Sequence, residues 1–262
     1  MRYFFISDVH ANFRAMMEAL VVCGFNEDED TLVSVGDLQD RGTEFWKCLN
    51  YVITLPHHIC LYGNHELEFY EKLTRHKKWD HFDVLNGAKA TFYSMMQNKV
   101  SRGSLSHLAW EFNNRGDFAG AKAKYIKYLN ECHMAAEFKD FIAVHCWVPN
   151  ICGAISSINW RAVKTFEPWY KAQWGNCCRN IEKRAFPDKQ IMVGHISANS
   201  IAYTCLKNRL VDPVDYAVFK QNLYAAFVCP KVIALDGDTA WGGDVRVYVY
   251  ESNEIPVFYD IL

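Results

Sequence analysis

Apolar residues in the first part of the chain fall into short runs, and polar residues follow each run. The runs at 3–6, 31–35 and 58–62 are rich in β-branched and aromatic residues, which indicates buried strands. Between them, residues 13–22 and about 43–53 repeat apolar side chains at helical spacing. A strand, helix, strand order of this kind is typical of α/β proteins.

The middle of the chain has a different pattern. A helix is expected from residue 66 to about 78, and residues 70–140 then repeat apolar positions at helical spacing without a strong strand signal. We interpret this stretch as a helical insertion or cap. The lysines of this stretch are expected to lie on a solvent-exposed face of the helices. Contact of one of them with a substrate anion is the alternative.

Strand patterns return toward the C-terminus. They occur at 141–144, 189–193, 232–235, 245–250 and 256–259. The intervening residues 150–187 are rich in aromatic side chains and read as loops. Because no repeat, low-complexity tract or linker divides the sequence, we expect one domain over residues 1–262 with the insertion at about 70–140.

Side chains that bind metals follow five of the predicted strands. The carboxyl ends of parallel strands meet at one edge of a sheet, so these side chains are expected to share a crevice. Their oxygen and imidazole donors, without a thiolate, favour Mn, Fe, Zn or Mg over copper. The residues are Asp8, His10, Asp37, Asn64, His65, His145 and His195.

Composition narrows the classes of function. The 262 residues are 50% apolar and carry a formal charge of −2, so a large core is available and no stable, charge-driven binding of nucleic acid is predicted. No apolar run is long enough for a membrane span, and the N-terminus lacks the pattern of a signal peptide. The ten cysteines form no C-x-x-C pair, which disfavours a zinc ribbon and fits a reducing cytoplasm.

The ordered motifs resemble those of the calcineurin-like metallophosphoesterases. They are Asp8-x-His10, the segment 36–42 (GDLQDRG), the segment 63–66 (GNHE), His145, and Gly194-His195. The GDxxDRG and GNHE motifs resemble those of the phosphoprotein-phosphatase branch of this superfamily. Together with residues 235–243, they most resemble bacteriophage lambda-type and bacterial serine/threonine phosphatases and symmetrical diadenosine tetraphosphatases, which suggests a bacterial or phage-infected cytoplasm.

The resemblance implies a β-sandwich of two mixed sheets flanked by helices, and a centre of two divalent metal ions. Asp8 and His10 would hold the first ion, Asp37 would bridge, and Asn64, His145 and His195 would complete the second. Mn²⁺ is the expected metal, and Fe, Zn, Ni and Mg are the alternatives.

The resemblance also assigns catalytic roles. A metal-activated water or hydroxide would attack phosphorus directly, and His65 would protonate the leaving oxygen with Asp40 orienting its ring. His65 as a metal ligand is the alternative. Arg41, Arg161 and Asn64 would bind the phosphate, since guanidinium groups suit that anion. Glu66 is interpreted as a helix N-terminal carboxylate outside the site.

The substrate stays open at this point. A phosphorylated protein or small phosphoester, cleaved by a serine/threonine phosphatase, is the first expectation. A diadenosine tetraphosphate or other nucleotide or RNA-end phosphohydrolase is the alternative, and an inactive binding module is the third hypothesis. Trp147, beside the ligand His145, either packs in the core or stacks on a base or aromatic ester. The sequence does not indicate an oligomeric state.

Overall fold

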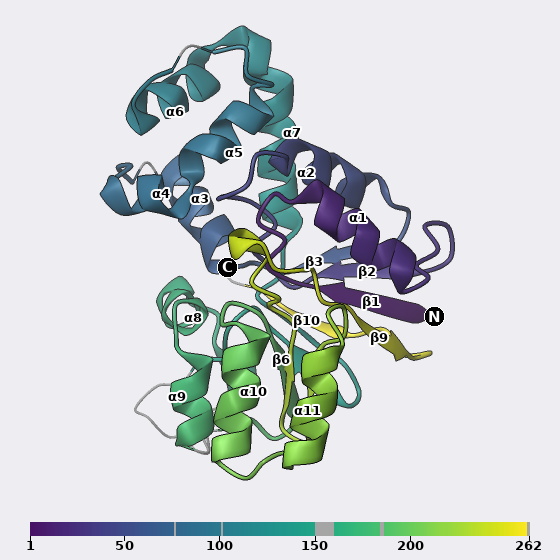
Figure 1. Ribbon diagram of the computed structural model, residues 1–262. Coiled ribbons are helices and arrows are strands. Elements are labelled where there is room, and N and C mark those ends of the chain that lie inside the picture. The colour runs from purple at the N-terminus through teal and green to yellow at the C-terminus, as the bar shows by residue number, and fades with distance from the viewer. Residues whose placement is uncertain (76, 101, 150–159, 184–185, 261–262) are drawn as a thin grey trace.

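A computed structural model describes residues 1–75, 77–100, 102–149, 160–183 and 186–260. Two sheets form the centre of the fold (Figure 1). The first has the order β3-β2-β1-β9 and the second the order β10-β4-β5-β6-β8-β7. The first contains β1 (Arg2–Ile6), β2 (Thr31–Ser34), β3 (His58–Cys60) and β9 (Tyr248–Glu251). The second contains β4 (Ala135–Glu137), β5 (Phe141–Ala143), β6 (Gln190–Val193), β7 (Phe227–Val228), β8 (Val232–Ala234) and β10 (Val257–Tyr259).

Both sheets are mixed. In the first, β1, β2 and β3 are parallel and β9 pairs antiparallel with β1. In the second, β5, β6 and β8 are parallel, whereas β4, β7 and β10 pair antiparallel. The expected sandwich of two mixed sheets is confirmed. All six parallel strands end at the same edge of their sheets, which places the loops after them close together.

The period of two along each strand divides the core into layers. Tyr3 and Phe5 of β1 pack between the sheets with Phe141 and Met192, while Phe4 points to the opposite face and the helices that cover it. β1 is therefore buried on both faces, as its continuous apolar run indicated.

Helices cover the outer faces, and Figure 1 shows α1 and α2 beside the first sheet and α9, α10 and α11 beside the second. The segment expected to be helical holds most of the remaining helices, which gather at one end of the molecule. It also ends in β4, which the pattern did not indicate. The bounds are α1 (Phe13–Val22), α2 (Phe45–Thr54), α3 (Asn64–Thr74), α4 (His81–Asn86), α5 (Ala88–Met95), α6 (Leu105–Asn114), α7 (Ala119–Glu131), α8 (Phe166–Gln173), α9 (Cys177–Glu182), α10 (Ala198–Lys207) and α11 (Pro213–Gln221), with 3-10 turns at Gly116–Phe118, Trp160–Ala162 and Thr239–Trp241.

The expectation of loops over 150–187 is wrong where the chain is described. Residues 150–159 lie outside the described ranges, but the remainder contains α8 and α9. Both helices are short, and Pro168 and two adjacent cysteines obscure the apolar period, so the pattern gave no helical signal. In the described ranges, no helix has the length and apolarity needed to cross a bilayer.

Candidate active site

Six of the seven predicted ligand residues gather around the buried carboxylate of the seventh, Asp37. Its Oδ2 lies 3.3 Å from Nε2 of His145, 3.7 Å from Nε2 of His65 and 3.8 Å from Nε2 of His10. Asn64 Oδ1 lies 2.9 Å from Nε2 of His145 and 2.9 Å from Nδ1 of His195. Asp8 Oδ1 completes the cluster at 3.9 Å from Nε2 of His10.

Backbone carbonyls hold two of these imidazoles in orientation. Nδ1 of His10 lies 2.9 Å from the carbonyl oxygen of Gln39, and Nδ1 of His145 lies 2.9 Å from that of Val35. Each Nδ1–H donates to a carbonyl, so each Nε2 faces Asp37 and offers its lone pair there when the ring is neutral. This second layer of hydrogen bonds is the usual support of a metal-binding histidine.

The backbone at the cluster adopts conformations that ordinary residues avoid. Asp8, His10, Asp37 and His195 have φ of 52°, 46°, 54° and 61°. A non-glycine residue in this left-handed region costs about 1–2 kcal/mol. Such strain concentrates where function fixes the direction of a side chain. Four of the ligand residues share this conformation, which is consistent with a functional origin of the cluster.

Glycines let the strand ends approach one another. A Cβ on Gly63 would overlap Oδ1 of Asp37, and one on Gly194 would overlap Oγ of Ser7. The glycine before Asn64 and the glycine before His195 are thus required by close packing, because any side chain there would push the ligands apart.

The donors fit two adjacent cations. One group contains His10, Asp37 and His65, and the other contains Asp37, His145 and His195. In each group the ligand atoms all lie within 4.8 Å of one another, and Asp37 belongs to both. The geometry therefore adds His65 to the first group, whereas the sequence analysis placed Asp8 there.

The four imidazoles fall into two pairs according to the direction in which their pKa is shifted. Burial lowers the pKa of His10 to about 3, and burial together with His145 lowers the pKa of His195 to about 4. Both rings are neutral at pH 7 and suited to bind a cation. Burial disfavours the charged forms of His65 and His145 too. The combined attraction of Asp37 with Asp40 for His65, and of Asp37 with Asp8 for His145, outweighs burial and raises their pKa to about 9 and about 10.

His65 and Arg41 lie together beside the cluster. Nδ1–H of His65 donates to Oδ2 of Asp40 over 2.7 Å, so Nε2 is the nitrogen that faces Asp37. Arg41 Nη1 lies 3.1 Å from Nε2 of His10, and Nη2 lies 3.4 Å from Nε2 of His65. The cation of Arg41 is thus within reach of an anion at the cluster.

Arg161 is the predicted site residue that the structure does not bring there. Its guanidinium forms a forked ion pair with Glu137, with contacts of 2.7 and 2.8 Å, and also contacts Asp188 at 3.0 Å. Asp188 precedes β6, whereas His195 follows it, so Arg161 lies at the opposite end of the strand. Its assignment to phosphate binding is corrected to a structural ion pair.

The sequence analysis missed three supporting side chains. Glu66 is fully buried and accepts the N–H groups of Asp37, Leu38 and Gly63 at 2.8, 3.0 and 3.0 Å. Thr91 of α5 receives the N–H of Asp40 at 3.0 Å and donates to its carboxylate, and Gln39 Nε2 donates to the carbonyl of His65. Glu66 was visible in the GNHE motif, but its partners are distant in sequence.

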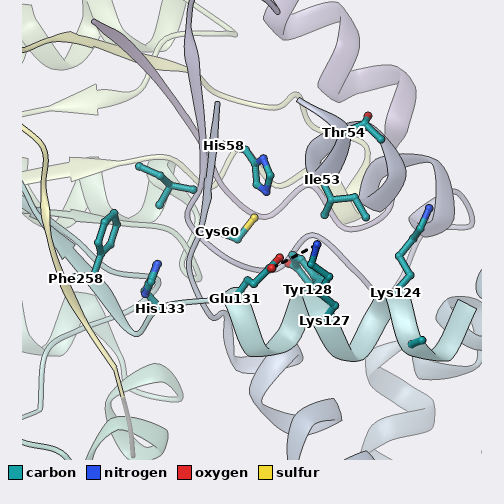
Figure 2. Close-up of a pocket in the computed structure, with 12 residues that line it drawn as sticks. Ile53, Thr54, His58, Cys60, Lys124, Lys127, Tyr128, Glu131, His133 and Phe258 are labelled. Carbon is teal, nitrogen blue, oxygen red and sulfur yellow. Dashed lines mark ion pairs between the residues drawn. The ribbon is translucent and has the colours of Figure 1, made fainter. Parts of the chain in front are cut away.

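A large cavity in the molecule does not coincide with this site. A cavity of about 930 Å³ lies between α7 and β3 (Figure 2). His58, Lys127 and Phe258 are among its lining residues, and no predicted site residue is. The titratable residues and the strained backbone therefore identify the site.

Comparisons with known proteins agree with this geometry. The calcineurin-like phosphoesterase family matches residues 1–211. A symmetrical bis(5'-nucleosyl)-tetraphosphatase of Buchnera aphidicola subsp. Schizaphis graminum is 33% identical over 97% of this chain and 96% of its own length. Serine/threonine-protein phosphatase 1 of Salmonella typhimurium is 39% identical over 61 residues, or 23% of this chain and 28% of that protein.

A solved structure supports the same fold. A cold-active protein-tyrosine phosphatase of a psychrophilic Shewanella species has a TM-score of 0.53 at 14% identity, covering 99% of this chain and 78% of its own. At that identity the likeness concerns the fold alone. The match over most of the chain, the full-length relative and the paired ligand groups agree, and the chain belongs to the calcineurin-like phosphoesterase family.

Proposed function

We propose that this protein hydrolyses the P–O–P linkage of dinucleoside polyphosphates at a centre of two divalent cations. The observation that carries the chemistry is the single carboxylate, Asp37, shared by two groups of ligands. The observation that favours this substrate is the full-length similarity to a symmetrical bis(5'-nucleosyl)-tetraphosphatase.

The proposed ligands are those of the sequence analysis, Asp8, His10, Asp37, Asn64, His145 and His195. His65 is assigned as the proton donor, and its binding of a cation is the alternative. Two divalent cations bound there would supply the Lewis acidity that activates water and neutralises phosphoryl charge. Mn²⁺ is the proposed metal, since oxygen and imidazole donors suit it.

The remaining steps are performed by side chains. Arg41 holds the non-bridging oxygens of the phosphate, because its guanidinium presents paired donors. Water adds to phosphorus, the bridging P–O bond breaks, and Nε2 of His65 gives its proton to the departing oxygen. Asp40 keeps the imidazole oriented through Nδ1, and the proton lost by the water restores His65 through solvent.

Phosphomonoester hydrolysis on a phosphoprotein is the second candidate. The similarity to serine/threonine-protein phosphatase 1 of Salmonella typhimurium favours it. That similarity covers 23% of this chain, so it bears on part of the site rather than on the whole substrate surface.

One experiment separates these candidates. Metal-stripped protein is reloaded with Mn, Mg, Zn or Ni and given diadenosine tetraphosphate or a phosphoserine peptide, with Asp37→Asn as the inactive control. The proposal expects metal-dependent release of two ADP and a higher kcat/KM for the dinucleotide. Release of phosphate from the peptide, without cleavage of the dinucleotide, would overturn the proposed substrate. The proposed metal-dependent chemistry would still stand. Inactivity of the metal-loaded protein on both would overturn the proposed function.

A further inference from the structure

A second cavity lies beside the metal-ligand cluster. Its volume is about 650 Å³, and α8, α9 and the segment after His145 line it. Trp147, Lys171, Trp174 and Arg179 are among the lining residues. A cavity of this size is in the range that accommodates a small molecule. None of the proposed catalytic side chains lines it, so the phosphoryl chemistry does not account for it.

Trp174 connects this cavity to the cluster. Its ring centroid lies 6.4 Å from that of His65 and 6.5 Å from that of His195. The side chain lines the cavity and is nevertheless 38% exposed. An indole that is partly open to solvent beside buried imidazoles offers a flat surface on which a planar ring can stack.

Trp147 adds a polar group to the same cavity. The side chain is 1% exposed, and its Nε1 has no hydrogen-bond partner in the part of the chain that the structure describes. An indole N–H can only donate. A buried donor left unpaired costs about 1–3 kcal/mol.

The residues that line the cavity include no unpaired carboxylate that would repel a nucleotide. Lys171 pairs with Glu167 over 3.0 Å, so those two charges offset each other. Arg179 of α9 is exposed and forms no ion pair with any described carboxylate. The remaining charge at the cavity is therefore positive.

We propose that this cavity is the base-binding subsite of the enzyme. The nucleobase of a nucleotide substrate stacks on Trp174 in the cavity that Trp147 also lines, and the phosphates extend past Trp174 to Arg41 and the metal ligands. The inference rests on the proposed function, because it names the part of the protein that recognises the nucleoside half of that substrate.

The test compares two ligands that differ only in the nucleoside. Adenosine 5'-(α,β-methylene)diphosphate and methylenediphosphonate carry the same non-hydrolysable phosphorus group, and calorimetry on the Mn-loaded protein gives both dissociation constants. We expect the nucleotide to bind at least tenfold more tightly than the base-free ligand. Equal affinities in the wild-type protein would overturn the proposal without any variant.

Variants then identify the stacking residue. Trp174→Ala is expected to reduce the preference for the nucleotide by about 5- to 150-fold, the range for stacking of a base on an aromatic ring. Trp174→Phe should recover most of it, because a ring is restored. The control is Trp110→Ala, since Trp110 on α6 is 60% exposed and does not line the cavity. An unchanged preference in Trp174→Ala would refute the assignment.

The outcomes also separate this inference from the proposed function. A protein that prefers the nucleotide but does not cleave diadenosine tetraphosphate would support the subsite and overturn the proposed function. A protein that cleaves the dinucleotide and shows no preference for the nucleotide over the base-free ligand would support the proposed function and overturn the subsite.

Discussion

Removal of His65 tests whether this residue supplies a proton or only completes the cluster. The ring is buried, and the 2.7 Å hydrogen bond to Asp40 fixes Nδ1, so Nε2 has one direction in which to act. His65→Asn removes that proton donor. General acid catalysis contributes about 10²- to 10⁴-fold to a rate, which is about 2.7–5.5 kcal/mol of transition-state stabilisation.

The loss should depend on the leaving group. The leaving oxygen of phenyl phosphate is a phenolate, with a pKa of about 10 as in tyrosine, and it needs a proton in the transition state. The leaving group of 4-nitrophenyl phosphate is a weaker base. We expect His65→Asn to lower kcat/KM by about 10²-fold or more on phenyl phosphate and by less than about tenfold on 4-nitrophenyl phosphate.

Steady-state kinetics on the two aryl phosphates, with metal content measured for each preparation, checks this expectation. His133→Asn is the matched control, since His133 pairs with Asp260 away from the cluster. Equal losses on both esters, or a loss that follows metal content, would refute the role as proton donor. His65 would then act as a ligand of the group that it forms with His10 and Asp37.

Three further predictions concern the support of the site. Glu66→Gln should lower the free energy of unfolding by about 1–3 kcal/mol in urea denaturation. The two carboxylate oxygens of Glu66 accept three backbone N–H groups, and the amide of glutamine replaces one of these oxygens with an NH₂ donor. Glu131→Gln, at an exposed ion pair with Lys127, should change it by no more than about 1 kcal/mol, and equal effects would contradict the argument. Arg161→Ala should leave kcat/KM within twofold while lowering stability by about 1–3 kcal/mol, and a selective loss of activity would restore Arg161 to the site. Chelation should abolish phosphoester hydrolysis and lower the melting temperature, and Mn²⁺ at about 100 times its Kd should restore about 2.7 kcal/mol; an unchanged melting temperature would contradict a metal that binds the folded site.

The strands that carry ligands were predictable because their patterns are local. Residues 3–6 and 31–35 are continuous apolar runs that end in polar residues, and β1 and β2 occupy them. α1 spans the expected residues 13–22 because its apolar side chains repeat at helical spacing. In contrast, β4 contains only Ala135, Ala136 and Glu137, and its pairing with β5 and β10 rather than its propensity makes it a strand.

The sequence analysis fell short where a role depends on distant partners. Glu66 lies in the first turn of α3, as its interpretation as a helix N-terminal carboxylate requires, but it has a further role. Its acceptor role is set by the N–H groups of Asp37 and Leu38, which lie 29 and 28 residues earlier in the chain. Arg161 was assigned through a loosely matching loop, and its contacts with Glu137 and Asp188 are each more than 20 residues away.

The strain at the site connects the fold to the chemistry. Asp40 and Arg41, with φ of 67° and 66°, share the left-handed conformation of Asp8, His10, Asp37 and His195. A glycine at any of these positions would relieve the strain and remove the functional side chain, so the sequence retains the costly residue. Glu66 and Thr91 hold two of the loops by hydrogen bonds to the N–H groups of Asp37 and Asp40. The energy of those buried hydrogen bonds offsets the strain, which is why the side chains that support the site are as necessary to it as the ligands.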